Sequence, residues 1–338
     1  MADLNELLKH TSRSLYLSAA LLPPDVRAAF STAYLLCRYA DSIADTTLLP
    51  AEKRLHWIEQ FPTLITHPDE EKFKAITQNI ISSATNKHEE TLLHNLPACV
   101  EAFSQLNEAQ RQATLDVVHA VCEGMKIDLT TFPDEKSGKV KAFVTPEELE
   151  NYCHLMGGEP GIFWSRLIEN STTTLRHRNI FFPLGKDVGD ALQIVNILRD
   201  LPRDLRIGRC YLPSDDLVEE GLIASDLLKP EFGQKLEPIK RKWIRWARKK
   251  LISACSYFAA IPKTQLRHRA AVAWPVLWAA DTLNKLEQEP NLLDPQVRVK
   301  ITRQRIYGTM LATPLILISN QLFDKWLHAK LTPSQKGS

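Results

Sequence analysis

Apolar residues recur along this chain at the three- and four-residue intervals of amphipathic helices, and no region alternates with period two for long. The pattern predicts helices at residues 23–46, 52–64, 69–84, 97–124, 145–157, 187–201, 236–260, 270–287 and 297–327, with loops at 133–141 and 208–216. Thr145 followed by Pro146 and two glutamates is typical of a helix start, with an N-cap, a first-position proline and an acidic first turn. No linker divides the chain, so we expect one all-α domain over residues 1–338.

The composition is that of an ordinary soluble globular protein, with 44% apolar and 24% charged residues. The formal net charge is only +2, so charge gives no case for nucleic-acid binding. No GxGxxG or GxxxxGK(S/T) loop occurs, which argues against a nucleotide-binding βαβ fold. The six cysteines form no CxxC pair, and the polar first residues do not resemble a secretory leader. We therefore expect a cytoplasmic protein with reduced thiols.

Two segments raise the question of membrane contact. Ile306–Phe323 carries no charge but includes polar residues and Pro314, so it falls short of a spanning helix. A packed core helix is the favoured interpretation, and a surface-bound segment is the alternative. Lys240–Lys250 combines an apolar stripe with many cations. It predicts a core helix with a solvated basic face, and peripheral attachment to the anionic inner face of a membrane is the alternative.

A first set of polar residues lies on the helix predicted for residues 23–46. Tyr34, Arg38, Asp41 and Asp45 are spaced four, three and four residues apart, so they share one narrow stripe. A DxxxD pair is weak evidence by itself, and a solvated helix face explains it more simply.

A second stripe extends along the helix predicted for residues 187–201. Its members, spaced three, four and four residues apart, are Gln193, Asn196, Asp200 and Asp204. The other faces of this helix are apolar, which predicts an interior position. Carboxylates there require partners, because isolated buried charges cost several kcal/mol. Arg199 and Arg203 could supply local ion pairs, which is the purely structural interpretation.

Taken together, the two stripes favour a metal–diphosphate site. Four carboxylates that converge on one cavity would repel one another, and Mg²⁺ removes this repulsion while bridging carboxylates to substrate phosphates. The arginines near these motifs that could bind diphosphate oxygens are Arg13, Arg38, Arg199 and Arg209. Metal and arginines would stabilise a departing diphosphate, and a carbocation formed from an allylic substrate would need an apolar, dry cavity.

Five short motifs follow one another in the chain. They are Thr11–Ser14, Tyr34–Asp45, Tyr152–Gly161, Gln193–Asp204 and Arg209–Pro213. In these motifs the chain resembles the squalene and phytoene synthase family over nearly its whole length, and five motifs in order are far more specific than any one. The resemblance implies the isoprenoid synthase α-fold, a single-domain helical bundle around a central cavity lined by both stripes.

The resemblance also implies roles for individual residues. Magnesium is implied at Asp41, Asp45, Asn196, Asp200 and Asp204. The substrate diphosphate is implied at Ser12, Arg13, Tyr34, Arg38, Gln193 and Arg209. The residues implied in catalysis are Arg13, Tyr34, Arg38 and Tyr152, of which the last takes or relays a proton.

Within the family, the surroundings of Tyr152 and the run Val299–Arg303 look more like squalene synthase than phytoene synthase. That run is similar to the basic segment with which squalene synthases hold NADPH. The implied cofactor contacts are Asn196, Arg199, Lys300 and Arg303. A plain basic helix start is the alternative for Lys300 and Arg303.

The implied reaction joins two farnesyl diphosphates head to head to presqualene diphosphate, which NADPH then reduces to squalene. Two alternatives stay open. One is a reductant-free enzyme of the same family that makes phytoene, dehydrosqualene or presqualene diphosphate. The other is a non-catalytic helical binding or scaffold subunit.

Three departures from the family pattern stand out. Ala44 replaces an acid that relatives often carry in the first stripe. Pro202 removes a backbone hydrogen bond and is expected to kink or end its helix before Asp204. Glu159 and Pro160 replace two small or apolar residues, a change expected to reshape the cavity near Tyr152. The chain also lacks the hydrophobic C-terminal anchor of eukaryotic squalene synthases, so no transmembrane anchor and a soluble bacterial form are expected.

Overall fold

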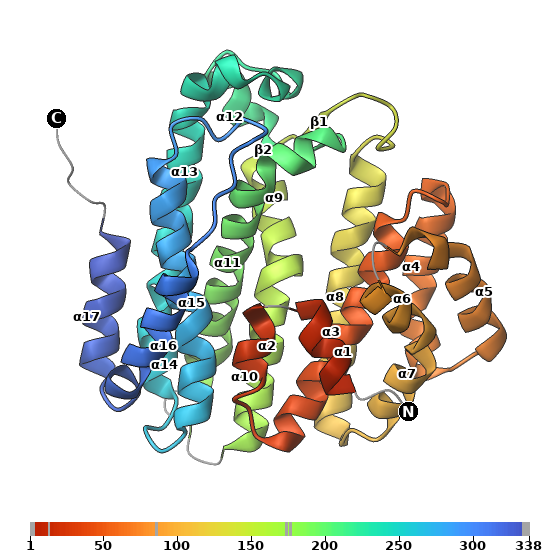
Figure 1. Cartoon of the computed structure of the whole chain (residues 1–338), viewed down its shortest axis with the longest axis vertical. Helices are drawn as coiled ribbons and strands as arrows, with labels where there is room; N and C mark the ends of the chain where they lie inside the picture. Colours follow the sequence, from red (N-terminus) through yellow and green to blue (C-terminus); the bar gives the residue numbers. More distant parts are fainter. Residues whose placement is uncertain (1–3, 13, 85–86, 173–174, 176–177, 333–338) are drawn as a thin grey trace. The chain divides into compact units, whose positions relative to one another are not determined.

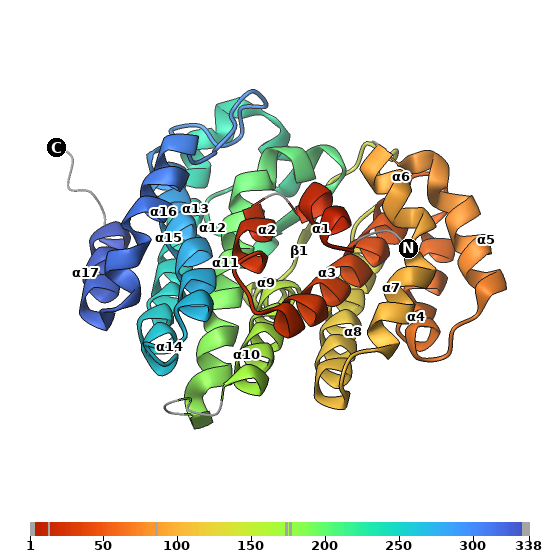
Figure 2. The same cartoon turned by 60° about the horizontal axis from the view of Figure 1, so that its bottom comes forward.

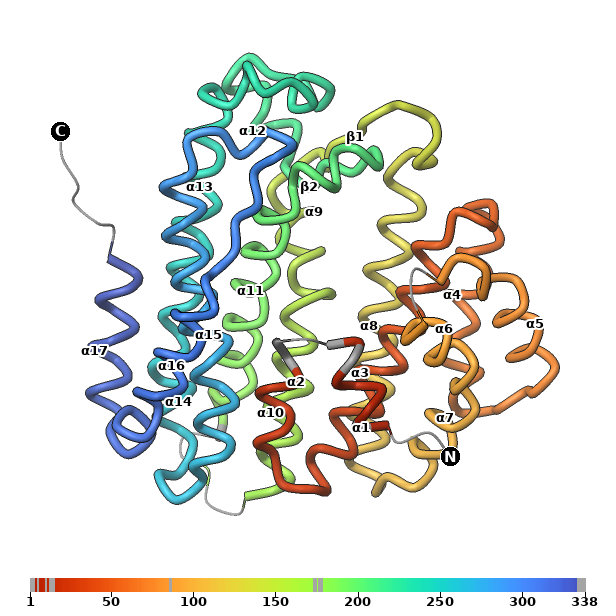
Figure 3. The backbone as a smooth tube through the Cα atoms, viewed as in Figure 1, coloured from red at the N-terminus to blue at the C-terminus, as the bar shows by residue number. Residues whose placement is uncertain are grey.

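Helices build almost all of this protein (Figures 1 and 2), so the all-α prediction is confirmed. The computed structural model describes residues 4–12, 14–84, 87–172, 175 and 178–332, and Figure 3 traces their backbone. Its contacts divide the chain into two compact units, residues 1–131 with 163–173 and residues 132–162 with 174–338. The expectation of a single domain over residues 1–338 stays a prediction.

The first unit contains the N-terminal helices. They are α1 (Leu4–Ser12), α2 (Ser14–Ala19), α3 (Pro24–Asp45), α4 (Ala51–Thr66), α5 (Glu70–Ile80), α6 (Lys87–His94), α7 (Leu96–Ser104) and α8 (Glu108–Thr131), with a 3₁₀ turn η1 (Ile81–Ser83). The long helix α3 packs against α4, α7 and α8. The buried Arg54 of α4 donates from Nη1 to the carbonyl oxygen of Ala44 at 2.9 Å. This bond satisfies one of the open carbonyls at the end of α3.

The second unit is built around α11. Its helices are α9 (Pro146–Cys153), a π-helical turn η2 (His154–Gly158), the start of α10 (Glu159–Ser171), α11 (Arg178–Arg206), α12 (Ser214–Glu219), α13 (Gly233–Leu251), α14 (Ser253–Ala260), α15 (Leu266–Gln288), α16 (Arg303–Leu317) and α17 (Asn320–Leu331), with 3₁₀ turns η3 (Ala224–Leu228) and η4 (Pro230–Phe232). The 29-residue α11 packs against η2, α13, α14 and α15. Because so many neighbours surround it, α11 forms the core of this unit.

Several predicted boundaries are wrong, each for a local reason. The helix predicted at 97–124 is two helices, because Asn107 accepts the backbone N–H of Gln110 at 2.9 Å and so caps a new start. The helix predicted at 297–327 is also two, and Ser319 caps the second by accepting the N–H of Leu322. The helix predicted at 236–260 divides into α13 and α14.

Part of the loop predicted at 208–216 is ordered secondary structure. Strand β2 (Arg209–Pro213) pairs in parallel with β1 (Lys141–Phe143), with Lys141 opposite Arg209. Gly208 has φ +86, a left-handed conformation that glycine adopts without steric cost, and it turns the chain from α11 into β2. Strands this short carry too few residues for a period-two pattern to appear in the sequence.

The predicted helix end at Leu201 is wrong, because α11 continues through Pro202. An interior proline costs about 3 kcal/mol in a helix. Leu201 and Leu205 on either side are buried, and burying a leucine contributes about 2 kcal/mol each, which offsets that cost. Asp204 therefore remains on the helical face of Asp200.

Glycines let η2 and α10 approach α11 closely. A Cβ on Gly157 would overlap the carbonyl oxygen of Gly189, and a Cβ on Gly189 would overlap that of Gly157. A Cβ on Gly161 would likewise overlap the carbonyl oxygen of Gly185. Since backbone meets backbone, no side-chain movement could make room. The glycines of the third motif thus hold the segment after Tyr152 against α11.

Gly189→Ala is expected to lower the free energy of unfolding by about 2 kcal/mol, because the added methyl must push two backbones apart. Urea denaturation measures the change. The matched control is Gly308→Ala in α16, where nothing lies within 4 Å of the added Cβ. There the higher helix propensity of alanine should stabilise by up to about 1 kcal/mol. Equal effects at the two sites would contradict the close approach.

Candidate functional site

The first stripe lies on α3 as predicted, and its residues interact with one another. Arg38 forms an ion pair with Asp41 one turn further along the helix. Its other terminal nitrogen, Nη2, lies 3.7 Å from Oε1 of Glu89 on α6. Glu89 also accepts a hydrogen bond from Ser42 at 3.4 Å. Arg38 is therefore held between two carboxylates, and its head group stays about one-third exposed, with a side-chain accessibility of 38%.

Glu89 was missed by the sequence analysis. It lies on a different helix from Arg38 and in no recognisable motif, so no local spacing could identify it. Only the packing of α6 beside α3 brings the two together.

Tyr34 connects the first stripe to the first motif. Its hydroxyl donates to the backbone oxygen of Thr11, at the end of α1, at 3.2 Å. Burial raises the pKa of Tyr34 to about 12, although the charge of Arg38 opposes the shift. The hydroxyl is therefore protonated at neutral pH and acts as a donor. Of the adjacent predicted residues, Arg13 and the side chain of Ser12 lie outside the part of the chain that the structure describes.

The second stripe lies on α11, and its carboxylate has a local partner. Arg199 donates to both oxygens of Asp200, from Nε at 3.0 Å and from Nη2 at 2.5 Å. Asn196 donates to Oε1 of Gln193 at 3.3 Å. The predicted interior position is wrong for Asp200, because 39% of its side chain is exposed. The ion pair between Arg199 and Asp200 that the purely structural interpretation expects is therefore present, and both of its side chains are partly exposed.

These donors suit Mg²⁺. Carboxylate and amide oxygens are its preferred protein ligands, and it is commonly held by one or two carboxylates together with substrate phosphates. Within the described residues, no three His, Cys, Asp or Glu side chains gather closely enough to form a preformed metal cage. Asp41 and Asp45 would hold metal on α3, while Asn196, Asp200 and Asp204 would do so on α11. The two stripes belong to different units, and their convergence on one cavity stays a prediction.

Tyr152 lies in a buried aromatic cluster. Its hydroxyl donates to the hydroxyl of Tyr211 at 3.3 Å, and the two rings stack with centroids 4.8 Å apart. Phe143 packs on both tyrosines, and Phe132 lies edge-on to Tyr211. The π-helical turn η2 follows directly after α9, and such turns are frequent at functional sites. Tyr211 belongs to the fifth motif, but only the fold shows that it orients Tyr152.

Arg209, on the same strand as Tyr211, is largely buried. Its Nη2 lies 3.3 Å from Oε1 of Glu135, in the loop before β1. A guanidinium with only 11% of its side chain exposed is restricted in orientation, which suits a fixed contact with a diphosphate oxygen.

The two predicted cofactor cations near the C-terminus are exposed. Lys300 lines a depression of about 250 Å³ together with Lys285, Gln288, Glu289, Arg298 and Val299. Arg303 begins α16, where Thr302 caps the helix by accepting the N–H of Arg305. The other two predicted contacts, Asn196 and Arg199, do not line this depression.

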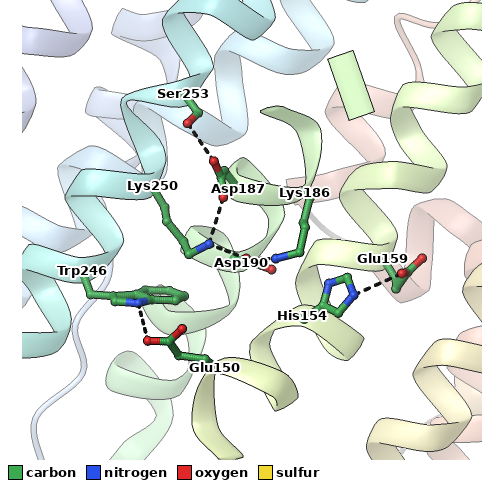
Figure 4. Close-up of polar contacts among 9 residues, drawn as sticks. All are labelled: Glu150, His154, Glu159, Lys186, Asp187, Asp190, Trp246, Lys250 and Ser253. Atoms are coloured by element: carbon green, nitrogen blue, oxygen red, sulfur yellow. Dashed lines mark hydrogen bonds and ion pairs between the residues drawn. The ribbon is translucent and has the colours of Figure 1, made fainter. Parts of the chain in front are cut away.

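A charged network beside η2 was also missed (Figure 4). The buried Asp190 accepts hydrogen bonds from Lys186 and Lys250, each at 2.8 Å. Lys250 also donates to Asp187, which in turn accepts from Ser253. The Lys186–Asp190 spacing of four residues on one helix was a detectable signal, but the link to α13 was not.

Comparisons with known proteins agree with these motifs. The model of the squalene/phytoene synthase family matches residues 8–305. A bifunctional lycopene cyclase/phytoene synthase of Arthroderma gypseum is 30% identical over 254 residues, which is 74% of this chain and 40% of that protein. The chain thus spans about two-fifths of the length of this bifunctional relative. A squalene synthase of Schizosaccharomyces pombe is 25% identical over 334 residues, covering 97% of this chain and 69% of that protein.

Among solved structures, TcSQS in complex with the ligand BPH1237 matches 99% of this chain and 92% of its own, with a TM-score of 0.80 and 18% identity. This similarity shows the all-α isoprenoid synthase fold. Together with the family match over most of the sequence, it establishes that the chain belongs to the squalene/phytoene synthase family.

Proposed function

We propose that this chain is a Mg²⁺-dependent prenyltransferase that condenses two farnesyl diphosphates head to head to presqualene diphosphate and reduces this with NADPH to squalene. The observation that carries the proposal is an arginine–aspartate ion pair on each of two helices. On α3, Arg38 is paired with Asp41, and on α11, Arg199 is paired with Asp200. Each pair combines a candidate metal ligand with a candidate diphosphate ligand.

The ion pairs suggest how the chain would receive its substrate. Bound Mg²⁺ would neutralise the diphosphate and stabilise the charge on the departing oxygen. Asp41 and Asp200 are partly exposed and would exchange their arginine partners for the metal. Arg38 and Arg199 would then be released to bind diphosphate oxygens. Arg209 would add a fixed contact from β2.

The aromatic cluster suits the carbocation chemistry of the proposed reaction. The head-to-head condensation releases one diphosphate and one proton. Tyr152, oriented by its bond to Tyr211, would take or relay that proton. The faces of the surrounding rings attract positive charge, and their burial excludes water that would quench a cation.

The reductive step rests on two observations. The Schizosaccharomyces pombe squalene synthase matches this chain almost from end to end, and Lys300 with Arg298 gives the depression beside the end of α15 a positive rim suited to phosphate. A reductant-free reaction is the second candidate, because the bifunctional lycopene cyclase/phytoene synthase of Arthroderma gypseum is 30% identical to this chain, against 25% for the squalene synthase, and phytoene formation needs no NADPH. A scaffold role without catalysis is the third.

Incubation with farnesyl diphosphate and Mg²⁺, with and without NADPH, separates these candidates. Squalene should form only with NADPH, and presqualene diphosphate should accumulate without it. If NADPH leaves the product unchanged, the squalene assignment is wrong and the reductant-free candidate replaces it. If no Mg²⁺-dependent diphosphate release occurs, the chain is not a prenyltransferase of this kind.

The double variant Lys300→Ala, Arg303→Ala tests the cofactor contacts. Each lost charged hydrogen bond should weaken NADPH binding about tenfold, so KM for NADPH should rise by roughly 100-fold. Diphosphate release without NADPH should stay within about twofold of wild type. The control is Lys249→Ala, an exposed lysine on α13, which should change neither quantity. If KM for NADPH is unchanged in the double variant, Lys300 and Arg303 do not bind NADPH, and they are simply the basic start of a helix.

A further inference from the structure

Five large apolar side chains form an exposed ridge in the second unit. Tyr307, Leu311 and Leu315 follow one another on α16, and the ridge continues through Ile318 to Leu322 on α17. Their exposed fractions are 60%, 82%, 66%, 59% and 47%. At about 100° per residue the first four fall within roughly 80° of the helix circumference, so they form one ridge. We call it the α16–α17 apolar stripe.

The opposite face of α16 is anchored inside the unit. Thr309 and Thr313 are buried there with Ile316 and Leu317. The indole nitrogen of Trp274 on α15 donates to Oγ1 of Thr313 at 2.7 Å. α16 thus buries two threonines together with Ile316 and Leu317 and turns three large apolar side chains to the outside, whereas an ordinary surface helix exposes a polar face. The expectation of a packed core helix at Ile306–Phe323 is therefore wrong for this face.

Exposed cations flank the stripe. The segment from residue 295 to residue 323 contains no Asp or Glu, and its basic residues are Arg298, Lys300, Arg303 and Arg305, all exposed. Exposed Lys325 follows on α17. In the part of the chain that the structure describes, no carboxylate pairs with Arg305 or Lys325. The acids nearest to them in sequence, Asp294 for Arg305 and Asp324 for Lys325, are only partly exposed.

The basic helix α13 offers no comparable surface. Its apolar residues Trp243, Ala247 and Leu251 are buried, as the core-helix interpretation predicts. Many of its cations are held in ion pairs within the unit. The pairs are Lys242 with Asp216, Arg248 with Glu287, and Lys250 with Asp187 and Asp190.

We propose that the α16–α17 apolar stripe docks the protein on the surface of an anionic lipid bilayer. Apolar side chains along an exposed helix face can enter the acyl boundary, and the flanking cations Arg305 and Lys325 would meet anionic head groups. A second copy fits less well, because pairing two such stripes would bring the cations of both copies together with no acid to compensate. No helix among the described residues has the length and apolarity to cross a bilayer, so this attachment is by surface contact.

Flotation of the full chain with vesicles tests the proposal without substrate, so the outcome is independent of the proposed reaction. Wild type should bind phosphatidylcholine vesicles that contain phosphatidylglycerol, and high salt should weaken binding. Leu311→Ser with Leu315→Ser should reduce partitioning at least about tenfold. Arg305→Glu with Lys325→Glu should reduce it about tenfold or more on anionic vesicles and little on phosphatidylcholine alone.

Matched controls keep these outcomes specific. Val218→Ser with Ile223→Ser removes two apolar side chains of similar exposure, 68% and 61%, from another surface. Arg245→Glu with Lys249→Glu makes the same charge change on the exposed side of α13. Both controls should bind within about twofold of wild type. No binding by wild type, equal losses in the controls, or a dimer that Leu311→Ser with Leu315→Ser dissociates would each overturn the proposal.

Discussion

Asp200→Asn is expected to lower kcat/KM for farnesyl diphosphate by about 10³-fold, a typical effect of removing one charge-stabilising group from an active site. The amide cannot match a carboxylate as a ligand for Mg²⁺. Half-maximal activity should also require a higher Mg²⁺ concentration. Diphosphate release over a Mg²⁺ titration measures both changes. Asp41→Asn should behave in the same way, because Asp41 is likewise paired with an arginine of its own helix.

Asp187→Asn is the matched control for Asp200→Asn. It makes the same chemical change on the same helix, on the opposite side of α11 from Asp200. Its activity should stay within about twofold of wild type. Far-ultraviolet circular dichroism should be unchanged in both variants, since an exposed ion pair contributes at most about 1 kcal/mol to stability. Equal losses of activity in the two variants would rule out the second stripe as the metal–diphosphate site.

Asp190→Asn is expected to lower the free energy of unfolding by about 3 kcal/mol, the largest effect on stability that we expect from a polar substitution in this chain. Only 2% of the Asp190 side chain is exposed, and it neutralises both Lys186 and Lys250 (Figure 4). Burial favours a lower pKa for Lys250, but Asp190 and Asp187 together hold it above its usual range. Removing one carboxylate leaves a cation in a poorly solvated position. Urea denaturation measures the change.

Asp187→Asn is again the comparison, because Asp187 shares Lys250 with Asp190 but is 36% exposed. Its loss should cost less than about 1 kcal/mol. The difference between the two variants in the free energy of unfolding therefore measures the effect of burial separately from that of the ion pair. Two variants of equal stability would mean that water reaches Asp190, against the packing of α11 between η2 and α13.

Sequence periodicity located the long helices well and their ends poorly. The predicted start of α3 is correct within one residue, because two prolines before an apolar helix leave little choice. The break between α7 and α8 was missed, because the apolar pattern continues across it. Asn107 caps a new helix there only when tertiary packing favours the turn. Pro202 led to a predicted helix end that the structure does not have, because the burial of Leu201 and Leu205 outweighs the cost of the proline in the helix.

For the candidate site, spacing alone placed Arg38 beside Asp41, because residues three apart share a helix face. It offered the pairing of Arg199 with Asp200 only as one option, because residues adjacent in sequence point about 100° apart on a helix. Spacing could not find Glu89, which reaches Arg38 from another helix. It could not show that Tyr211 stacks on Tyr152, because that contact depends on the pairing of β2 with β1.

The amino-acid sequence by itself determined the helical class, the two polar stripes and the family motifs, since each depends on intervals within one helix or on short segments in order. Only the tertiary structure decided which polar groups are buried and which face of an apolar helix points outward. Asp187 and Asp190 look alike in sequence, yet packing makes one exposed and the other buried. The outward face of α16 was decided in the same way, by packing that buries Ile316 and Leu317 and by the hydrogen bond from Trp274 to the buried Thr313. Burial is a property of long-range contacts, which no local pattern encodes.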